Sequence, residues 1–162
     1  MWSLDGRVWK PELVVLRINR AATCVKWSPN EKKFAVGCGH RCICVCYYEQ
    51  NQGFWVAKHI KKQIRSTTLC IDWHPNNILI AAGGTDFKCR IFGAHVPEVD
   101  GQQTTSTPWG NQIKSADCIA EYSASNHGWV HACSFNPAGN LLAYVGHDST
   151  VYVVNTDINV RE

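Results

Sequence analysis

Apolar and polar residues alternate in three segments of the chain, each ending just before a proline. An aromatic residue stands two positions before the proline in every case: Trp27 before Pro29, Trp73 before Pro75 and Phe135 before Pro137. The residue two positions earlier is also apolar or a cysteine, so the period is two, as in a β-strand with one buried face. The pattern predicts one strand at the same place in each of three internal repeats.

Two further apolar segments follow each proline. Residues 34–36, 79–81 and 141–143 come after a short polar turn and are interpreted as the second strands of hairpins. In the second and third repeats the next tight turn holds Asp86 and Asp148, and aspartate stabilises turns by binding nearby backbone amides. Third strands are predicted where apolar residues stand 14 and 16 positions after the proline, at Ile43 and Val45, Cys89 and Ile91, and Val151 and Val153.

Fourth strands are predicted between the repeats. Residues 55–60 and 118–122 are suitably apolar, and we expect residues 13–16 to form such a strand before the first repeat. No segment shows the apolar spacing of a helix. The fold class is therefore all-β, with about three four-stranded antiparallel units.

The repeat length gives the domain organisation. The three prolines are 46 and 62 residues apart, and four strands in about 40–45 residues resemble the blades of WD-repeat β-propellers. Residues 1–162 are predicted to form an incomplete propeller, with repeats at about 12–47, 54–93 and 117–155. The excess in the second interval is predicted as an irregular surface insertion at about 96–110.

Composition narrows the class of protein. The chain has 162 residues, 45% of them hydrophobic and 18% charged, which is typical of a globular domain. Its longest apolar run, residues 78–82, is far too short to cross a bilayer, so we expect no membrane insertion. Nine cysteines, an odd number at uneven spacing, favour a reducing compartment, and we expect a cytoplasmic protein.

Charge is distributed unevenly along the chain. Residues 1–65 contain 12 basic and 4 acidic residues, whereas residues 66–162 contain 4 basic and 9 acidic residues. A solvated face is the first interpretation of the basic half, an acidic protein partner the second, and nucleic acid, with Phe54 and Trp55 as stacking residues, the last. The candidate partner-contact residues are Arg17, Arg20, Lys58, Lys61, Lys62 and Arg65.

Two kinds of chemistry have candidate residues in the sequence, and ordinary packing is the alternative for each. Cys38, His40, Cys42, Cys44 and Cys46 are of the residue types that bind zinc. The alternation of Cys42, Cys44 and Cys46 along a strand is not zinc-loop spacing, so we predict buried thiols and no metal. A hydrolase could use Ser66 with Asp72 and His74, or Cys70 as nucleophile. No nucleophile elbow or phosphate-binding glycine loop supports an enzyme, and we expect no cofactor.

Several segments resemble one family more closely than WD repeats in general. They are RINRAA at 17–22, KHIKK at 58–62, IRST at 64–67, DWHPNN at 72–77, DFKCRIF at 86–92, TPWG at 107–110, GWVH at 128–131 and HDST at 147–150. These segments resemble the WD-repeat first subunit of the actin-related protein 2/3 complex. The family's propeller has seven blades, of which this chain holds about three.

The resemblance implies a function by contact. It implies a non-catalytic scaffold subunit that supports actin nucleation and filament branching, with the other subunits of that complex, actin or actin-related proteins as partners, at the actin cytoskeleton. A WD-repeat adaptor of another multiprotein complex is the alternative, and a cysteine or serine hydrolase is the alternative from another class.

Overall fold

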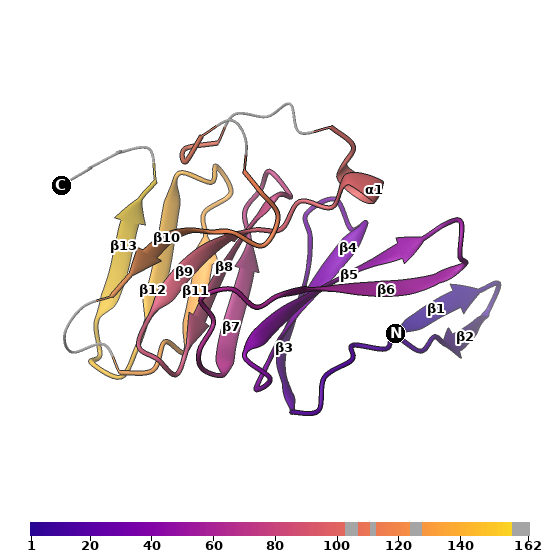
Figure 1. Ribbon diagram of the computed structural model, residues 1–162, viewed down its shortest axis with the longest axis horizontal. Coiled ribbons are helices and arrows are strands. Elements are labelled where there is room, and N and C mark those ends of the chain that lie inside the picture. Colours follow the sequence, from indigo (N-terminus) through magenta and orange to yellow (C-terminus); the bar gives the residue numbers. More distant parts are fainter. Residues whose placement is uncertain (103–106, 111–112, 124–127, 157–162) are drawn as a thin grey trace.

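The fold is a row of antiparallel β-sheets. The computed structural model describes residues 1–102, 107–110, 113–123 and 128–156. Within these residues the strands form two four-stranded sheets, a three-stranded sheet and a two-stranded hairpin (Figure 1). The first sheet consists of β3 (Ala22–Trp27), β4 (Lys33–Cys38), β5 (Cys42–Glu49) and β6 (Phe54–Ile60). The central sheet consists of β7 (Thr68–Trp73), β8 (Leu79–Gly84), β9 (Cys89–Gly93) and β10 (Cys118–Tyr122).

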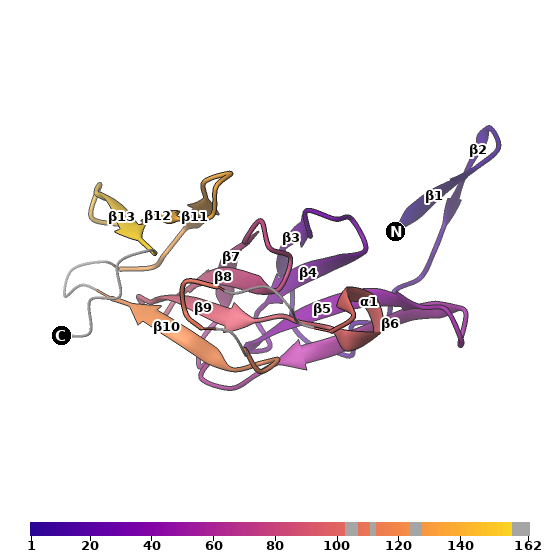
Figure 2. The same ribbon diagram turned by 90° about the horizontal axis from the view of Figure 1, so that it is seen from above.

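The remaining strands lie at the two ends of the row. The third sheet contains β11 (Ala132–Phe135), β12 (Leu141–Val145) and β13 (Val151–Asn155). The hairpin of β1 (Trp2–Asp5) and β2 (Val8–Pro11) extends away from the larger sheets (Figure 2). Strand β7 contacts β3 on one side and β11 on the other, so the first strand of each sheet lies beside the first strand of the next. This arrangement is that of consecutive propeller blades in an arc.

The backbone repeats as the sequence does. The turn after the first strand has a residue with positive φ at the second position past each proline: Glu31, Asn77 and Gly139, with φ of 60°, 65° and 79°. The turn after the second strand has another at Arg41, Phe87 and Ser149. Equivalent residues in three sheets therefore share an uncommon backbone conformation, which confirms the repeated unit.

Apolar residues fill both spaces between the sheets. One core cluster joins the first and central sheets through residues such as Val45 and Ile80, and a second joins the central and third sheets through residues such as Ile91 and Leu142. A third cluster lies on the other face of the first sheet, where Val14, Leu16 and Ile18 cover it. The central sheet is thus buried on both faces.

Polar bonds also join the sheets, and three consecutive residues of the central sheet carry many of them. The indole nitrogen of Trp73 donates to the carbonyl of Lys26 in the first sheet at 3.0 Å. Asp72 accepts from the amide of Phe135 in the third sheet at 2.8 Å, and the Nε2 atom of His74 contacts the carbonyl of Gly139 at 2.9 Å. The end of β7 therefore ties the central sheet to both neighbours.

A buried ion pair fixes the start of the insertion. Lys33 of β4 is fully buried, donates to the carbonyl of Ala94 at 3.0 Å and pairs with the carboxylate of Asp100. Its ammonium also lies 5.1 Å from the centre of the Trp73 ring. Burial lowers the pKa of Lys33, against the opposing effect of Asp100.

One expectation from the sequence is wrong in detail. Residues 13–16 form no strand, and the strand before them, Val8–Pro11, pairs with Trp2–Asp5 in a separate hairpin. The predicted insertion contains the helical turn α1 (Pro97–Asp100), where proline occupies the first turn. Val96, at the start of the predicted insertion, is buried. No helix among the described residues is long and apolar enough to span a membrane.

Candidate functional site

A depression of the described surface lies where the first and central sheets meet. It has a volume of about 920 Å³ and is formed by the segment before β3, the β4–β5 turn, the segment before β7 and the β8–β9 turn. Three arginines line it, Arg20, Arg41 and Arg65, together with His40 and several hydroxyl side chains. We call this surface the arginine depression.

The repeat positions these side chains. The amide of Gly39 donates to the carbonyl of Ala21 at 2.9 Å, and the amide of Thr85 donates to the carbonyl of Thr67 at 3.0 Å. These equivalent bonds hold each turn against the segment that leads into its own sheet. The Nδ1 atom of His40 contacts the side-chain oxygen of Asn19 at 2.6 Å, which closes the edge of the depression.

The charged residues that line the depression are all basic. No acidic residue is among those that line it, and none of its three arginines forms an ion pair with a described residue. Guanidinium groups bind carboxylates and phosphates in bidentate geometry. The depression is thus suited to an anionic group presented by a partner.

The six predicted contact residues do not form one patch. Arg20 and Arg65 meet at the arginine depression, which Arg41, missed in the sequence, completes. The signal for Arg41 was its place in the β4–β5 turn, which brings it to the same end of the sheet. Arg17 and Lys61 are exposed, and Arg17 has a φ of 54°.

Two of the six are already paired within the chain. The ammonium of Lys58 contacts both carboxylate oxygens of Glu98 at 2.7 and 2.8 Å and lowers the pKa of that carboxyl group. Lys62 pairs with Asp117 at 2.9 Å. These lysines present less free charge to a partner than the arginines of the depression do.

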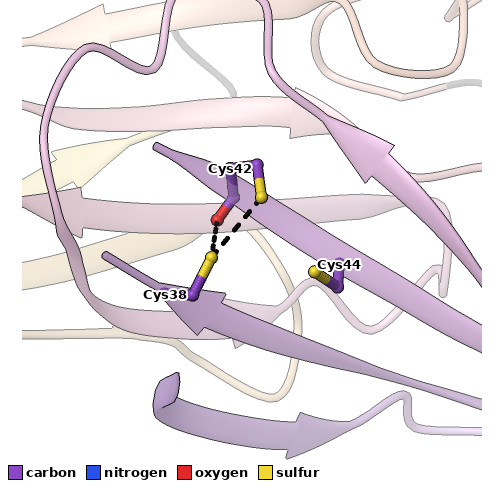
Figure 3. A group of neighbouring side chains, drawn as sticks. All are labelled: Cys38, Cys42 and Cys44. Carbon is purple, nitrogen blue, oxygen red and sulfur yellow. Dashed lines mark hydrogen bonds between the residues drawn. The ribbon is translucent and has the colours of Figure 1, made fainter. Parts of the chain in front are cut away.

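Three cysteines of the first sheet, Cys38, Cys42 and Cys44, lie close together (Figure 3). Cys38 and Cys42 are directly opposite across β4 and β5, with their sulfur atoms 3.4 Å apart. The sulfur of Cys44 completes a group in which all three lie within 4.8 Å of one another, and all three residues are fully buried. Contact with the Cys44 thiol is the main cause that lowers the pKa of Cys42 to about 6.

The hydrolase residues considered in the sequence are engaged elsewhere. The Nδ1 atom of His74 accepts from the amide of Asn76 at 3.1 Å, and its Nε2 atom contacts the carbonyl of Gly139. The hydroxyl of Ser66 accepts from the amide of Asp86 at 3.1 Å. The contact with the Cys133 thiol is the main cause that raises the pKa of Cys70, and burial raises this pKa further. These residues form no nucleophile–base pair.

The predicted repeat anchors lie at equivalent places but differ in exposure. Trp73 and Phe135 are buried, whereas Trp27 is 48% exposed. Pro29, Pro75 and Pro137 each begin the turn that follows the first strand. The carboxylate of Asp148 accepts from the amide of Thr150 at 3.3 Å, whereas Asp86 pairs with Arg90 at 2.8 Å. Trp55, considered for base stacking, packs against Trp27, Phe34 and Tyr48.

Comparison with known proteins agrees with the arrangement of the sheets as propeller blades. The family model described as WD domain, G-beta repeat matches residues 59–93 and 116–155. Actin-related protein 2/3 complex subunit 1A-B of Xenopus laevis is 56% identical over 161 residues, which cover 99% of this chain and 43% of the relative. The chain belongs to the subunit 1 family. In Schizosaccharomyces pombe, actin-related protein 2/3 complex subunit 1 is 54% identical over 149 residues, which cover 92% of this chain and 38% of the relative.

The relationship extends to plants. Actin-related protein 2/3 complex subunit 1A of Arabidopsis thaliana is 44% identical over 160 residues, which cover 96% of this chain and 40% of the relative. The chain therefore spans less than half the length of the subunit 1 family members that it matches. Within that span the family relationship and the WD-repeat architecture confirm the resemblance and the fold class drawn from the sequence.

Proposed function

We propose that the chain acts as a non-catalytic scaffold in an actin-related protein 2/3 complex, and that the arginine depression is its main contact with an acidic surface of a partner. The partner is another subunit of that complex, actin or an actin-related protein. The family relationship supports the assembly. The observation that supports the contact site is the three arginines around an open depression whose lining contains no carboxylate.

The mechanism is attraction followed by docking. Unpaired charge at the rim of a contact surface mainly raises the association rate, and this effect weakens as salt shortens the Debye length to about 8 Å at physiological ionic strength. Bidentate arginine bonds then orient the acidic group. Arg20 and Arg65 carry this role, with Arg17 and Lys61 as weaker contributors on exposed neighbouring segments.

The test is reconstitution with the remaining subunits. A subunit 1 family member that contains these residues is assembled with the other subunits, and association rates are measured by surface plasmon resonance across a salt series. We expect Arg20→Glu with Arg65→Glu to slow association by about tenfold or more at low salt. The control for a general effect of charge is Arg7→Glu with Lys10→Glu, which makes the same change of net charge at two exposed residues of the β1–β2 hairpin.

The outcomes separate the alternatives. Equal slowing by the Arg7→Glu, Lys10→Glu control would show a diffuse charge effect and contradict the arginine depression as the contact. An unchanged association rate in the Arg20→Glu, Arg65→Glu variant would also contradict the arginine depression as the contact. A chain that joins none of these subunits but retains another cellular partner would support an adaptor of a different complex. Lys61→Glu with Lys62→Glu is a less selective test, because the change at Lys62 also breaks its pair with Asp117.

A further inference from the structure

The three gathered thiols of the first sheet have a geometry that ordinary packing does not require. Cys38 ends β4 and Cys42 begins β5, so a tight turn places their side chains opposite each other. Cys44 lies two residues further along β5 and points to the same face, because side chains alternate along a strand. The spacing of the cysteines in the sequence does not show this three-sulfur group, because Cys38 lies on a different strand from Cys42 and Cys44.

We propose that Cys38, Cys42 and Cys44 bind a single thiophilic metal ion of low charge, with Cu(I) as the ion in question. The geometry of the sulfur atoms supports this. Three atoms that all lie within 4.8 Å of one another share a point within about 2.8 Å of each, and a metal–thiolate bond is about 2.3 Å long. Shifts of roughly 0.5 Å or less, within reach of side-chain rotation, bring the three sulfurs to bonding distance.

The number and type of ligands favour Cu(I) over zinc. Zinc in structural sites takes four ligands in a tetrahedron, whereas the described residues offer three at this place. All three cysteines are fully buried, so a water molecule is a poor fourth ligand. Soft thiolate ligands select Cu(I), and this ion accepts three sulfurs in a plane.

The surroundings provide a path of entry. Residues 13–18 cover the sulfur face without strand pairing. Next to them is an apolar hollow of about 300 Å³ lined by Val14, Leu16 and Val36. Displacement of this segment admits the ion.

Binding involves no change of oxidation state. Each thiol loses its proton to the buffer as its sulfur bonds to the metal, and the copper remains Cu(I). The charge of the assembled site is therefore negative.

Cys46 is the matched control. It lies on the same face of β5, is fully buried and belongs to the same apolar cluster, but its sulfur is not part of the three-sulfur group. A Cys→Ser change there introduces the same hydroxyl into the same environment.

The experiment titrates the full chain with Cu(I) under anaerobic conditions against bathocuproine disulfonate, a coloured competitor. We expect one Cu(I) per chain, and X-ray absorption should show three sulfur neighbours at about 2.3 Å. Cys42→Ser and Cys44→Ser should weaken binding by more than about a hundredfold, since changes even to outer-shell groups cost 10–100-fold. Cys46→Ser should bind as the unaltered chain does.

Three results would overturn the proposal: equal loss of copper in the Cys46 variant, absence of a one-to-one complex, or displacement of Cu(I) from the three cysteines by an equal amount of Zn(II). Circular dichroism checks that each variant is folded.

Discussion

The central and third sheets are built from the same repeat but differ in what covers them. Ile91 and Val153 both stand sixteen positions after the repeat proline, yet Ile91 is fully buried and Val153 is 60% exposed. Val45, at the same position of the first sheet, is 2% exposed. The central sheet has a sheet against each face, whereas the third sheet has one such neighbour among the described residues. The repeat determines which positions are apolar, and the neighbouring sheets determine which are buried.

The anchor tryptophans show the same difference. Trp73 is buried and bonded to the preceding sheet, whereas Trp27 is half exposed. The side chain of Trp73 reaches Lys26 because a complete sheet precedes it. Among the described residues, the first sheet has a four-stranded neighbour on the side of the central sheet, and Trp27 has no such partner strand to bond to. A repeat position thus gains its full stabilising role only at a junction between two sheets.

The largest expected effect comes from truncation at the matched apolar position. Ile91→Ala should lower the free energy of unfolding by about 2–5 kcal/mol, because it removes buried methylene groups and leaves a cavity between sheets. Val153→Ala should change it by less than about 0.5 kcal/mol, because that side chain is mostly in water. Guanidinium unfolding followed by circular dichroism measures both. Equal losses would show that the third sheet is covered in solution.

The anchor position should give a smaller difference. Trp73→Phe removes the indole donor to the carbonyl of Lys26, at a cost of about 0.5–1.5 kcal/mol. Trp27→Phe should cost less than about 0.5 kcal/mol at its half-exposed position. Far-ultraviolet circular dichroism is the suitable probe, because both changes alter tryptophan fluorescence. A larger loss at Trp27 would contradict the role assigned to the junction.

The smallest effect concerns pH at the junction between the central and third sheets. Burial lowers the pKa of His74, so the folded chain keeps this imidazole neutral where the unfolded chain protonates it. Stability from this residue is therefore complete above the unfolded pKa of about 6.5 and falls as pH decreases toward the lower folded value. His74→Gln should flatten the dependence of unfolding free energy on pH below about 6.5. A variant with the slope of the unaltered chain would exclude His74 as its source.

Much of the fold could be predicted from the local pattern of apolar residues, and the errors of that prediction have local causes. Period-two alternation located β7, whose Ile71 and Trp73 lie in a core, and also β3, where the alternating residues Val25 and Trp27 are 61% and 48% exposed. Residues 13–16 are equally apolar but cover the cysteine face without pairing. The signal that assigns the strand to Val8–Pro11 is Gly6, which has a φ of 62° and occupies the first place of a two-residue hairpin turn. The helical turn α1 is too short to show an apolar period.

The candidate sites depend on longer-range contacts and were harder to predict. Arg20 and Arg65 were identified by charge, but their meeting with Arg41 requires two sheets side by side. The neutralisation of Lys58 and Lys62 comes from Glu98 and Asp117, which lie 40 and 55 residues later in the chain. A count of charges along the sequence cannot show these ion pairs, because the partners are brought together by the fold.

The order in which the chain is synthesised matters for a structure joined in this way. Neighbouring strands within each sheet are also consecutive in the sequence, so most of their pairing closes short loops. The bonds from Trp73 to Lys26 and from His74 to Gly139 span 47 and 65 residues. Closing a longer loop costs more chain entropy. We expect each sheet to form as its strands leave the ribosome and then to dock onto the sheet made before it. Assembly then proceeds from the N-terminal side, and β7 takes part in both docking steps because it contacts β3 and β11.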